Sequence, residues 1–490
     1  MRKEFFFSIV TLLLKPALVL LRFRPIQSNH SQGATMKKNT TLLMIVTAAS
    51  WISSQAATLP TAPTDADYYN NGAPSAEKVE LGRLLFFDKI LSGNKNISCG
   101  TCHHPAFAGG DGLSVSIGEG GVGLGSARTT GSGSSAIKAR IGRNSPGLFN
   151  LGAKEFTKLN WQGRHQQNTK GLSLPCSNGR NNVCPTGLEN VIAGQNIFPL
   201  VNIDEMPGQT GENDVINAVP TGTAGVNRFP YMWEAIMARL RAIPDYVTKF
   251  KTVFPDVTDS SKMKIQHLTN ALAAFEATAF RADNSPFHRY LRGETTALTS
   301  AQVTGMNLFY GSANCASCHS GKFLTNQNFA AIAMPQLGPG VFVSGRATAQ
   351  RDVGRYEVTG STADKYKFRV PSLINVAQTA PYGHAGAYAT LDAVIRHHLD
   401  PVNSFKTWDR SQAILPAMPS GVVVNDFAVM DDSTKSNEIT TANKLAKSTL
   451  SDTDISNLIE FLNALTDQDA LDNLMEQVPT SVPSGLTVAD

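Results

Sequence analysis

The fold of this 490-residue chain is decided by two short stretches with one pattern, Cys99-Gly100-Thr101-Cys102-His103 and Cys315-Ala316-Ser317-Cys318-His319. Both read Cys-x-x-Cys-His, the signature of covalent c-type haem attachment. The two thiols bond to the haem vinyl groups, and the histidine becomes a ligand of the iron. A thioredoxin-like redox pair needs no histidine there, and an all-cysteine zinc site would leave both histidines unused. The repeated motif predicts two covalently bound haem c groups.

Two cysteines remain outside these motifs. Cys176 and Cys184 lie in the stretch from Pro175 to Gly187, which is rich in Gly, Asn and Pro. With six cysteines in 490 residues, a disulfide scaffold is excluded and each cysteine has to be interpreted by itself. We expect this last pair to form a disulfide within a loop.

Composition excludes several classes of protein. Hydrophobic residues make up 42% of the chain, which is enough for a sizeable core and excludes wholesale disorder. The net charge of +4 results from 43 basic and 39 acidic residues. This balance is too even to indicate a nucleic acid or an anionic membrane surface as partner.

The first 56 residues are expected to form a targeting region. A second start at Met36 is followed by Lys37-Lys38, an apolar run from Leu42 to Ala49, and the small-residue site Ser54-Gln55-Ala56. This order is typical of a secretory signal peptide. Residues 1–35 are then an upstream extension, with a retained membrane anchor as the alternative. The mature chain is expected in the periplasm, where disulfides persist.

Helical patterns dominate the rest of the chain, and strand signals are few. Helices are expected at Ala76 to Lys89, Tyr231 to Phe250, Ser260 to Phe280, from the N-cap Thr299 to Phe309, Leu391 to Leu399, and Asp452 to Leu465. The Gly-dominated stretch Gly118 to Gly133 predicts a mobile loop. We expect a mainly α protein with long loops and two cytochrome c-like haem domains, residues 57–283 and 284–490.

Further motifs accompany the haem signatures. They are Glu80-Leu-Gly-Arg-Leu-Leu-Phe-Phe-Asp88, Gly142-Arg-Asn-Ser-Pro146, Trp161-Gln-Gly-Arg164, Asp204-Glu-Met206, Phe368-Arg-Val-Pro-Ser372 and Pro381-Tyr-Gly-His384. In this order the chain resembles the bacterial dihaem cytochrome c peroxidases, whose superfamily includes the MauG-like protein-oxidising enzymes. The resemblance runs from about Ala76 to about Leu399. It implies one peroxidatic haem and one electron-transfer haem.

The resemblance also implies catalytic residues. Glu205 falls where the family keeps its catalytic glutamate, and Gln195 keeps the family spacing of ten residues before it. Peroxide cleavage needs a base to move a proton and donors to place the peroxide. Trp161 matches the tryptophan between the two haems. Without the resemblance, Glu205 beside Asp204 would be interpreted as a surface carboxylate and Trp161 as a core residue.

Other positions match the family's cofactor contacts. Arg369 aligns with a basic residue near the haem propionates, with a solvated arginine as the alternative. Asn144, Thr379 and Pro381 match the positions whose oxygens hold Ca2+ in the family, and such oxygens suit a hard cation. The resemblance therefore implies a Ca2+ site in addition to two haem c groups.

Two positions depart from the peroxidase pattern. Where many members carry a histidine that blocks the peroxidatic iron, this chain has Glu119, a weaker possible ligand on a Gly-rich tether. The distal ligand of the second haem is Met in peroxidases and Tyr in MauG-like enzymes, whereas His398 stands here. Because His397 is adjacent, a register uncertainty of one residue remains. We expect His103 and His319 as proximal ligands and His398 as the distal ligand.

Three functions are compatible with these observations. The first is a periplasmic dihaem peroxidase that reduces hydrogen peroxide with electrons from a small c-type cytochrome or cupredoxin. The second is a MauG-like enzyme that oxidises a protein or organic substrate, and the third is a non-catalytic electron-transfer cytochrome. A pure carrier gains nothing from Glu205 and Gln195, so we expect the peroxidase. A homodimer is compatible with the resemblance.

Overall fold

A computed structural model describes residues 59–490 except 178–181, 210, 339–350, 423–424 and 490. The predicted targeting region, residues 1–56, lies outside the described residues. The first helices are α1 (Ala76–Phe87), α2 (Cys99–Cys102), α3 (Val191–Asn196), α4 (Asp214–Asn217), α5 (Phe229–Arg241), α6 (Pro244–Val253), α7 (Ile265–Ala279), α8 (Pro286–Leu291) and α9 (Ser300–Tyr310). They are followed by α10 (Tyr356–Thr359), α11 (Leu391–Leu399), α12 (Pro401–Lys406), α13 (Ala428–Asp431), α14 (Ser433–Ala442), α15 (Asp452–Asn463) and α16 (Gln468–Met475).

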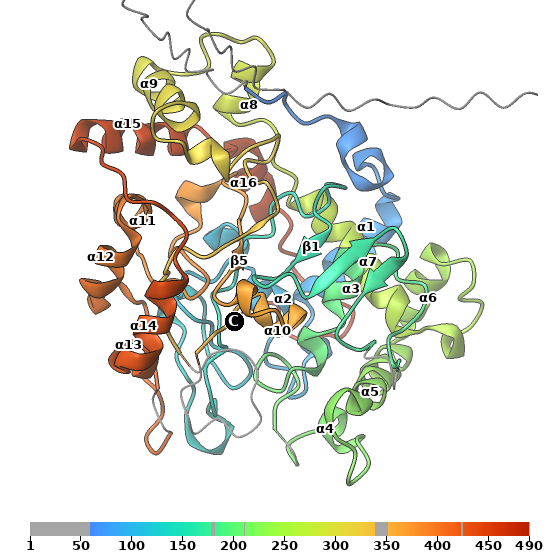
Figure 1. Cartoon of the computed structure of the whole chain (residues 1–490). Helices are drawn as coiled ribbons and strands as arrows, with labels where there is room; N and C mark the ends of the chain where they lie inside the picture. The colour runs from blue at the N-terminus through green and yellow to red at the C-terminus, as the bar shows by residue number, and fades with distance from the viewer. Residues whose placement is uncertain (1–58, 178–181, 210, 339–350, 423–424, 490) are drawn as a thin grey trace, which may run out of the picture. The chain divides into compact units, whose positions relative to one another are not determined.

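Strands are few and short in the described chain (Figure 1). The strands β1 (Lys158–Leu159), β2 (His165–Asn168) and β3 (Gly171–Ser173) form one antiparallel sheet. A second sheet pairs β4 (Phe329–Ala330) with β5 (Phe368–Arg369), also antiparallel. Long segments without regular structure connect the helices. The prediction of a mainly α protein with long loops and little strand is confirmed.

Helix termini follow local chemistry. The helix α9 begins directly after Thr299, whose hydroxyl accepts a hydrogen bond from Gln302 N. The helix expected from Tyr231 to Phe250 is wrong, because the structure has two helices, α5 and α6, that break before Pro244. Proline has no N–H to donate and disfavours helical geometry in the residue before it. Pro244 therefore begins α6 instead of continuing α5.

A pair of packed helices accompanies each haem motif. In the first pair, α1 crosses α7 so closely that a Cβ on Gly82 would lie 2.0 Å from Ala271 O. In the second pair, α9 crosses α15 and a Cβ on Gly305 would lie 1.9 Å from Asn457 O. Only glycine allows such an approach of two backbones. Both halves of the chain thus use a glycine to bring two helices into close contact.

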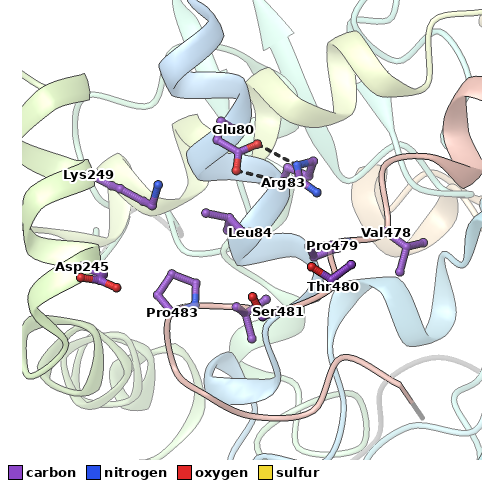
Figure 2. Close-up of a pocket in the computed structure, with 11 residues that line it drawn as sticks. Glu80, Arg83, Leu84, Asp245, Lys249, Val478, Pro479, Thr480, Ser481 and Pro483 are labelled. Atoms are coloured by element: carbon purple, nitrogen blue, oxygen red, sulfur yellow. Dashed lines mark hydrogen bonds and ion pairs between the residues drawn. The ribbon is translucent and has the colours of Figure 1, made fainter.

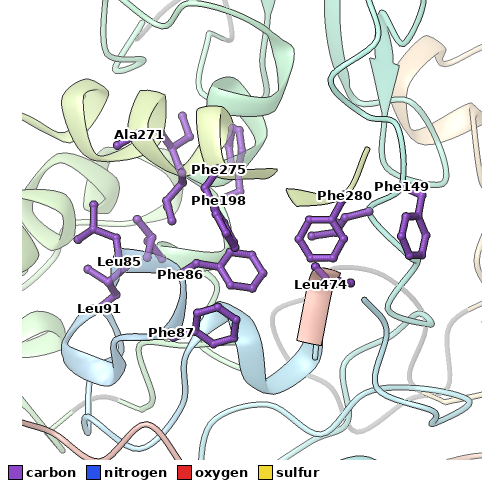
Figure 3. Close-up of a cluster of buried hydrophobic side chains, with 14 of the residues drawn as sticks. Leu85, Phe86, Phe87, Leu91, Phe149, Phe198, Ala271, Phe275, Phe280 and Leu474 are labelled. Carbon is purple, nitrogen blue, oxygen red and sulfur yellow. The ribbon is translucent and has the colours of Figure 1, made fainter. Parts of the chain in front are cut away.

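Buried aromatic side chains join the first helix pair (Figure 3). Phe86 of α1 lies 5.1 Å from Phe275 of α7 and 5.9 Å from Phe280, measured between ring centroids. Rings at such separations gain about 0.5–1.5 kcal/mol per pair beyond their burial. This cluster fixes α7 against α1, and α1 leads into the first haem motif.

The C-terminal segment returns to the N-terminal half. Lys89 Nζ donates to Ala489 O at 2.7 Å, and Ser484 Oγ donates to Asp88 Oδ1 at 2.7 Å. Between this segment and α1 lies an open cavity of about 510 Å³, beside the ion pair of Glu80 and Arg83 (Figure 2). The expected domain boundary near residue 283 stays a prediction. These contacts show that the last residues of the chain pack on the surface of the N-terminal half.

In the described part of the chain, no helix combines the length and the apolar character that crossing a bilayer requires.

Candidate active site

The first haem motif is a short helix followed by an oriented histidine. Cys99 and Cys102 stand at the two ends of α2, and neither forms a disulfide. The Nδ1–H of His103 donates to Gly109 O at 2.8 Å. Burial lowers the pKa of His103, which keeps the ring neutral. A neutral imidazole whose Nδ1–H is bonded to a carbonyl offers Nε2 to a metal.

The second motif brings two histidines close together, with their rings tilted by 58°. His319 lies 6.5 Å from His398 of α11, measured between ring centroids. Two N–metal bonds of about 2 Å, plus the distance from each nitrogen to its ring centre, give about 6.3 Å across one metal ion. The Nδ1–H of His398 donates to Val394 O at 2.8 Å, so Nε2 is the nitrogen left for a metal. Burial, together with the adjacent His398, lowers the pKa of His319 to about 4.

His397 has both ring nitrogens engaged. Its Nε2–H donates to Ile332 O at 2.8 Å, and its Nδ1 accepts from the hydroxyl of Tyr388 at 2.8 Å. Such a ring would have to break two buried hydrogen bonds before it could bind a metal. Of the two adjacent histidines, the structure brings His398 to His319 and holds His397 away by these bonds.

The donor set fits two haem c groups. The four motif cysteines, Cys99, Cys102, Cys315 and Cys318, take no part in a disulfide and are partly buried. Arg369 is buried, and its guanidinium makes only long contacts of 3.4 and 3.5 Å to neutral oxygens. Burial lowers the pKa of Arg369 to about 10. A buried cation without a carboxylate among the described residues suits an anionic cofactor group such as a propionate.

Glu205 lies in a segment with both amide and guanidinium neighbours. Asn202 Nδ2 donates to Glu205 Oε1 at 2.6 Å. Desolvation raises the pKa of Glu205, while the nearby charge of Arg164 opposes that rise. A raised pKa makes a carboxylate a stronger proton acceptor, which suits a group that transfers protons.

Gln195 contacts a histidine that sequence analysis missed. The Nδ1–H of His165 donates to Gln195 Oε1 at 3.1 Å, and His165 stacks on Phe198 with 4.6 Å between centroids. Arg164 lies over the same ring, its Cζ 5.5 Å from the centroid. The dipeptide Arg164-His165 thus links the surroundings of Glu205 and Gln195. Only the position of His165 directly after Trp161-Gln-Gly-Arg164 could have drawn attention to it.

Trp161 forms hydrogen bonds to two segments, one beside each haem motif. Its indole Nε1–H donates to Asn144 O at 3.1 Å, and the next residue, Ser145, has its hydroxyl 3.2 Å from His103 Nδ1. On the other side Trp161 O accepts from Arg369 N at 2.7 Å. Arg369 belongs to β5, which pairs with β4 in the segment after the second motif. Trp161 therefore stands in a continuous bonded connection between the two motifs.

Glu119 is held at the first motif's side of the molecule. Its Oε1 accepts from Asn94 Nδ2 at 2.7 Å and from Asn96 Nδ2 at 2.9 Å, and its backbone N donates to Glu205 O at 2.9 Å. Sequence analysis predicted a mobile loop for the Gly-rich stretch from Gly118 to Gly133, whereas the structure shows Glu119 held by these hydrogen bonds. The buried Arg128 donates to three carbonyls of the segment, at Ile117, Gly118 and Gly123, and ties it together.

The residues of the expected Ca2+ site lie in neighbouring segments. Asn144 N donates to His384 O at 3.0 Å, three residues beyond Pro381. A Cβ on Gly147 would lie 3.3 Å from Thr379 Cγ2. Among the described residues there is no cluster of three or more His, Cys, Asp or Glu side chains that could hold a metal ion.

Two further features complete the site. The predicted disulfide between Cys176 and Cys184 is confirmed, with the Cα atoms 5.1 Å apart. Sequence analysis missed the buried ion pair of Arg143 and Asp352, 2.6 Å long and next to His384. Asp352 belongs to no motif, so only the fold could reveal it.

Comparison with known proteins agrees with this donor set. The family model described as di-haem cytochrome c peroxidase matches residues 76–296. The cytochrome c551 peroxidase of Pseudomonas aeruginosa is 30% identical over 321 residues, which cover 64% of this chain and 70% of that protein. The chain belongs to the di-haem cytochrome c peroxidase family. It is therefore an oxidoreductase, and membership implies haem c as its cofactor.

Other members of this peroxidase family are similar over comparable lengths. The methylamine utilization protein MauG of Methylorubrum extorquens is 27% identical over 326 residues, 66% of this chain and 69% of that protein. The crystal structure of a MauG-like protein associated with microbial copper homeostasis is 25% identical, with a TM-score of 0.53. That match covers 86% of this chain and 96% of the other. The fold of the described chain is accordingly that of the dihaem peroxidases.

Proposed function

We propose that this chain reduces hydrogen peroxide to two molecules of water with two protons and two electrons. The electrons are supplied by a small c-type cytochrome or cupredoxin. The observation that carries the proposal is the surroundings of Glu205, a carboxyl group with a raised pKa. Its neighbour Arg164 is followed in the chain by His165, which contacts Gln195. An electron carrier needs neither group. Family membership and the similarity to a cytochrome c551 peroxidase support the same activity.

The proposed chemistry divides between cofactor and protein. When bound, haem iron supplies the electrons and the site at which the O–O bond breaks. Glu205 takes the proton from the near oxygen of the peroxide and returns it to the far oxygen, which leaves as water. The raised pKa of Glu205 favours this transfer, because it makes the carboxylate a stronger proton acceptor than an exposed glutamate. Gln195 donates from its amide and orients the peroxide.

The second histidine pair suits an electron relay. His319 and His398 would hold one iron from both sides, which leaves no position for peroxide at that centre. The haem held by His103 would then supply the peroxide chemistry, and Trp161, bonded to Asn144 and to Arg369, would lie between the two motifs. Imidazole in place of a thioether ligand lowers the reduction potential of the relay haem. Arg369 would neutralise a propionate.

Location and calcium belong to the same proposal. The signal-like N-terminus supports export to the periplasm, and the disulfide of Cys176 and Cys184 suits that oxidising compartment. Asn144, Thr379 and Pro381 would bind Ca2+ through neutral oxygens.

Glu205→Gln tests the proposal. The amide keeps the shape and a hydrogen-bond acceptor for Asn202 but cannot take the proton, so peroxide turnover should fall about 10²–10⁴-fold while both haems stay attached. Asp204→Asn is the matched control, because it removes the adjacent carboxylate and should keep turnover. Equal rates in wild type and Glu205→Gln would reduce Glu205 to a structural carboxylate and overturn the proposed mechanism.

A MauG-like oxidation of a protein or organic substrate is the second candidate. It is supported by the similarity to the methylamine utilization protein MauG. His398 differs both from the Met of peroxidases and from the Tyr of MauG-like enzymes, so this position decides for neither function. Measuring peroxide consumed against reduced cytochrome c oxidised separates the two. Two equivalents oxidised per peroxide support the peroxidase, and peroxide loss without donor oxidation supports the alternative.

A further inference from the structure

His165 is buried, and its hydrogen bonds are incomplete. Only 1% of its surface is exposed, and the imidazole stacks on Phe198 with an interplanar angle of 25°. Its Nδ1 is 3.1 Å from Gln195 Oε1. Its Nε2 finds no hydrogen-bond partner among the described residues. The side chain therefore has one strong polar contact, and that contact is to Gln195.

The contact determines which end of the Gln195 amide is free. An amide oxygen accepts and an amide nitrogen donates, so the imidazole must donate its Nδ1–H to Oε1. With Oε1 held by His165, the –NH2 group of Gln195 is directed to the other side. Peroxide is placed by hydrogen-bond donors, so this orientation presents the useful end of the amide.

Burial keeps His165 in the state that this role requires. Desolvation and the adjacent Arg164 lower the pKa of His165 well below its ordinary value. The ring is therefore neutral and carries a single N–H, which Gln195 receives. The groups that face it are Arg164, Gln195 and the ring of Phe198, and none of them is a carboxylate.

His165 belongs to the small antiparallel sheet of β1, β2 and β3. It is the first residue of β2, where Leu159 of β1 pairs with it. The hairpin of β2 and β3 fixes the backbone of His165 relative to α3, which ends with Gln195 and Asn196. The sheet thereby supports Gln195, which lies thirty positions further along the chain than His165.

We propose that His165 is a positioning residue of the peroxide site, which holds Gln195 so that its amide N–H groups face the peroxide. The inference rests on the proposed function for its substrate, because the role of Gln195 is part of that proposal. The contact of His165 with Gln195 itself comes from the structure alone.

Two variants separate hydrogen bonding from packing. His165→Phe keeps a ring on Phe198 but loses the donor, and His165→Asn keeps a donor at the position of Nδ1 but loses the stacking. We expect the second-order rate constant for peroxide with the oxidised holoenzyme to fall roughly 3- to 10-fold in His165→Phe, the effect of one neutral hydrogen bond. His165→Asn should recover most of that rate. The reverse order, with a slow Asn variant and a fast Phe variant, would overturn the proposal.

A matched control comes from another buried histidine. His267 is 5% exposed and lies 4.9 Å from the ring of Phe254, but it contacts Asp256 and no residue of the site. His267→Phe makes the same chemical change in a similar environment. It should lower the stability without changing the peroxide rate.

Fluoride binding provides a measurement that does not depend on turnover. Fluoride bound to the oxidised first haem accepts hydrogen bonds, so its dissociation constant reports the donor that Gln195 presents. We expect His165→Phe and Gln195→Ala to weaken fluoride binding to a similar extent, and the double variant to be no weaker than Gln195→Ala alone. Additive effects in the double variant would show that His165 acts independently of Gln195 and would refute the inference.

The same measurements separate this inference from the proposed function. If Gln195→Ala weakens fluoride binding but peroxide turnover is absent in wild type, the proposed function fails and the positioning role stands. If turnover is normal and His165→Phe changes neither fluoride affinity nor rate, the positioning role fails and the peroxidase stands.

Discussion

Glu276 is a carboxyl group in the interior beside the first haem motif, and replacing it by Gln should change how stability depends on pH. It lies on α7 and is 6% exposed. Its one described hydrogen bond comes from Asn196 Nδ2, at 2.8 Å to Oε1. Burial raises the pKa of Glu276 from 4.5 to about 8, and the Asn196 bond opposes that rise only in part. At neutral pH the folded protein therefore holds a proton here that the unfolded chain has released.

The sign and size of the effect follow from linkage. Because the native pKa is above the unfolded one, the stabilisation is fully present below pH 4.5 and is lost as pH rises through about 8. At about 1.4 kcal/mol per pKa unit, the free energy of unfolding should lose on the order of 4 kcal/mol between pH 5 and pH 9 from this group. Glu276→Gln cannot ionise, and its amide oxygen still accepts from Asn196. The variant should match wild type at pH 5 and be the more stable protein at pH 9.

Guanidinium unfolding of the holoprotein at pH 5, 7 and 9, followed by far-ultraviolet circular dichroism, measures this difference. Glu294→Gln is the control, because the Glu294 side chain is 48% exposed and its replacement should leave the pH dependence unchanged. Parallel curves for wild type and Glu276→Gln would refute the reasoning, since they would mean that Glu276 is ionised in the folded state.

Three further outcomes are expected. His398→Ala should convert the second haem from low spin to high spin in the absorption and EPR spectra, whereas His397→Ala should leave it low spin; the opposite pattern would assign the ligand to His397. Oxidised wild type should react with peroxide in stopped-flow mixing without prior reduction, because the Glu119 carboxylate is held by two amides; Glu119→His should restore dependence on pre-reduction, and a wild type that reacts only after one-electron reduction would contradict this. Incubation with a Ca2+ chelator should lower peroxide turnover and re-added Ca2+ should restore it; unchanged turnover with no Ca2+ released would remove the calcium site.

Sequence patterns predicted what local chemistry controls. The N-cap Thr299, the apolar spacing of α11 and the two haem motifs are each contained in a few consecutive residues, and the corresponding elements were expected correctly. Pro244 also indicates the break between α5 and α6, but the apolar residues on both sides keep a helical spacing, which favoured a single helix. The single helix expected there was wrong because the helix-breaking effect of Pro244 was underestimated.

The site residues that sequence analysis missed depend on packing between distant segments. His165 and Gln195 are thirty residues apart, and Asn196 and Glu276 are eighty apart, so no local pattern connects them. Both pairs nevertheless meet at the end of α3, where His165 holds Gln195 and Glu276 accepts from Asn196. Neither partner is a charged group at neutral pH, because burial lowers the pKa of His165 and raises the pKa of Glu276.

His165 and Glu276 fix the end of α3 without bringing a charge close to Glu205. Charges at these positions would shift the proton affinity of Glu205, whose pKa is already set by desolvation against the charge of Arg164. An imidazole and a carboxyl group that stay uncharged can fix the end of α3 by hydrogen bonds without adding to that balance. In the proposed mechanism, the orientation of Gln195 is then set by hydrogen bonds, whereas the proton affinity of Glu205 is set by its own desolvation and by Arg164.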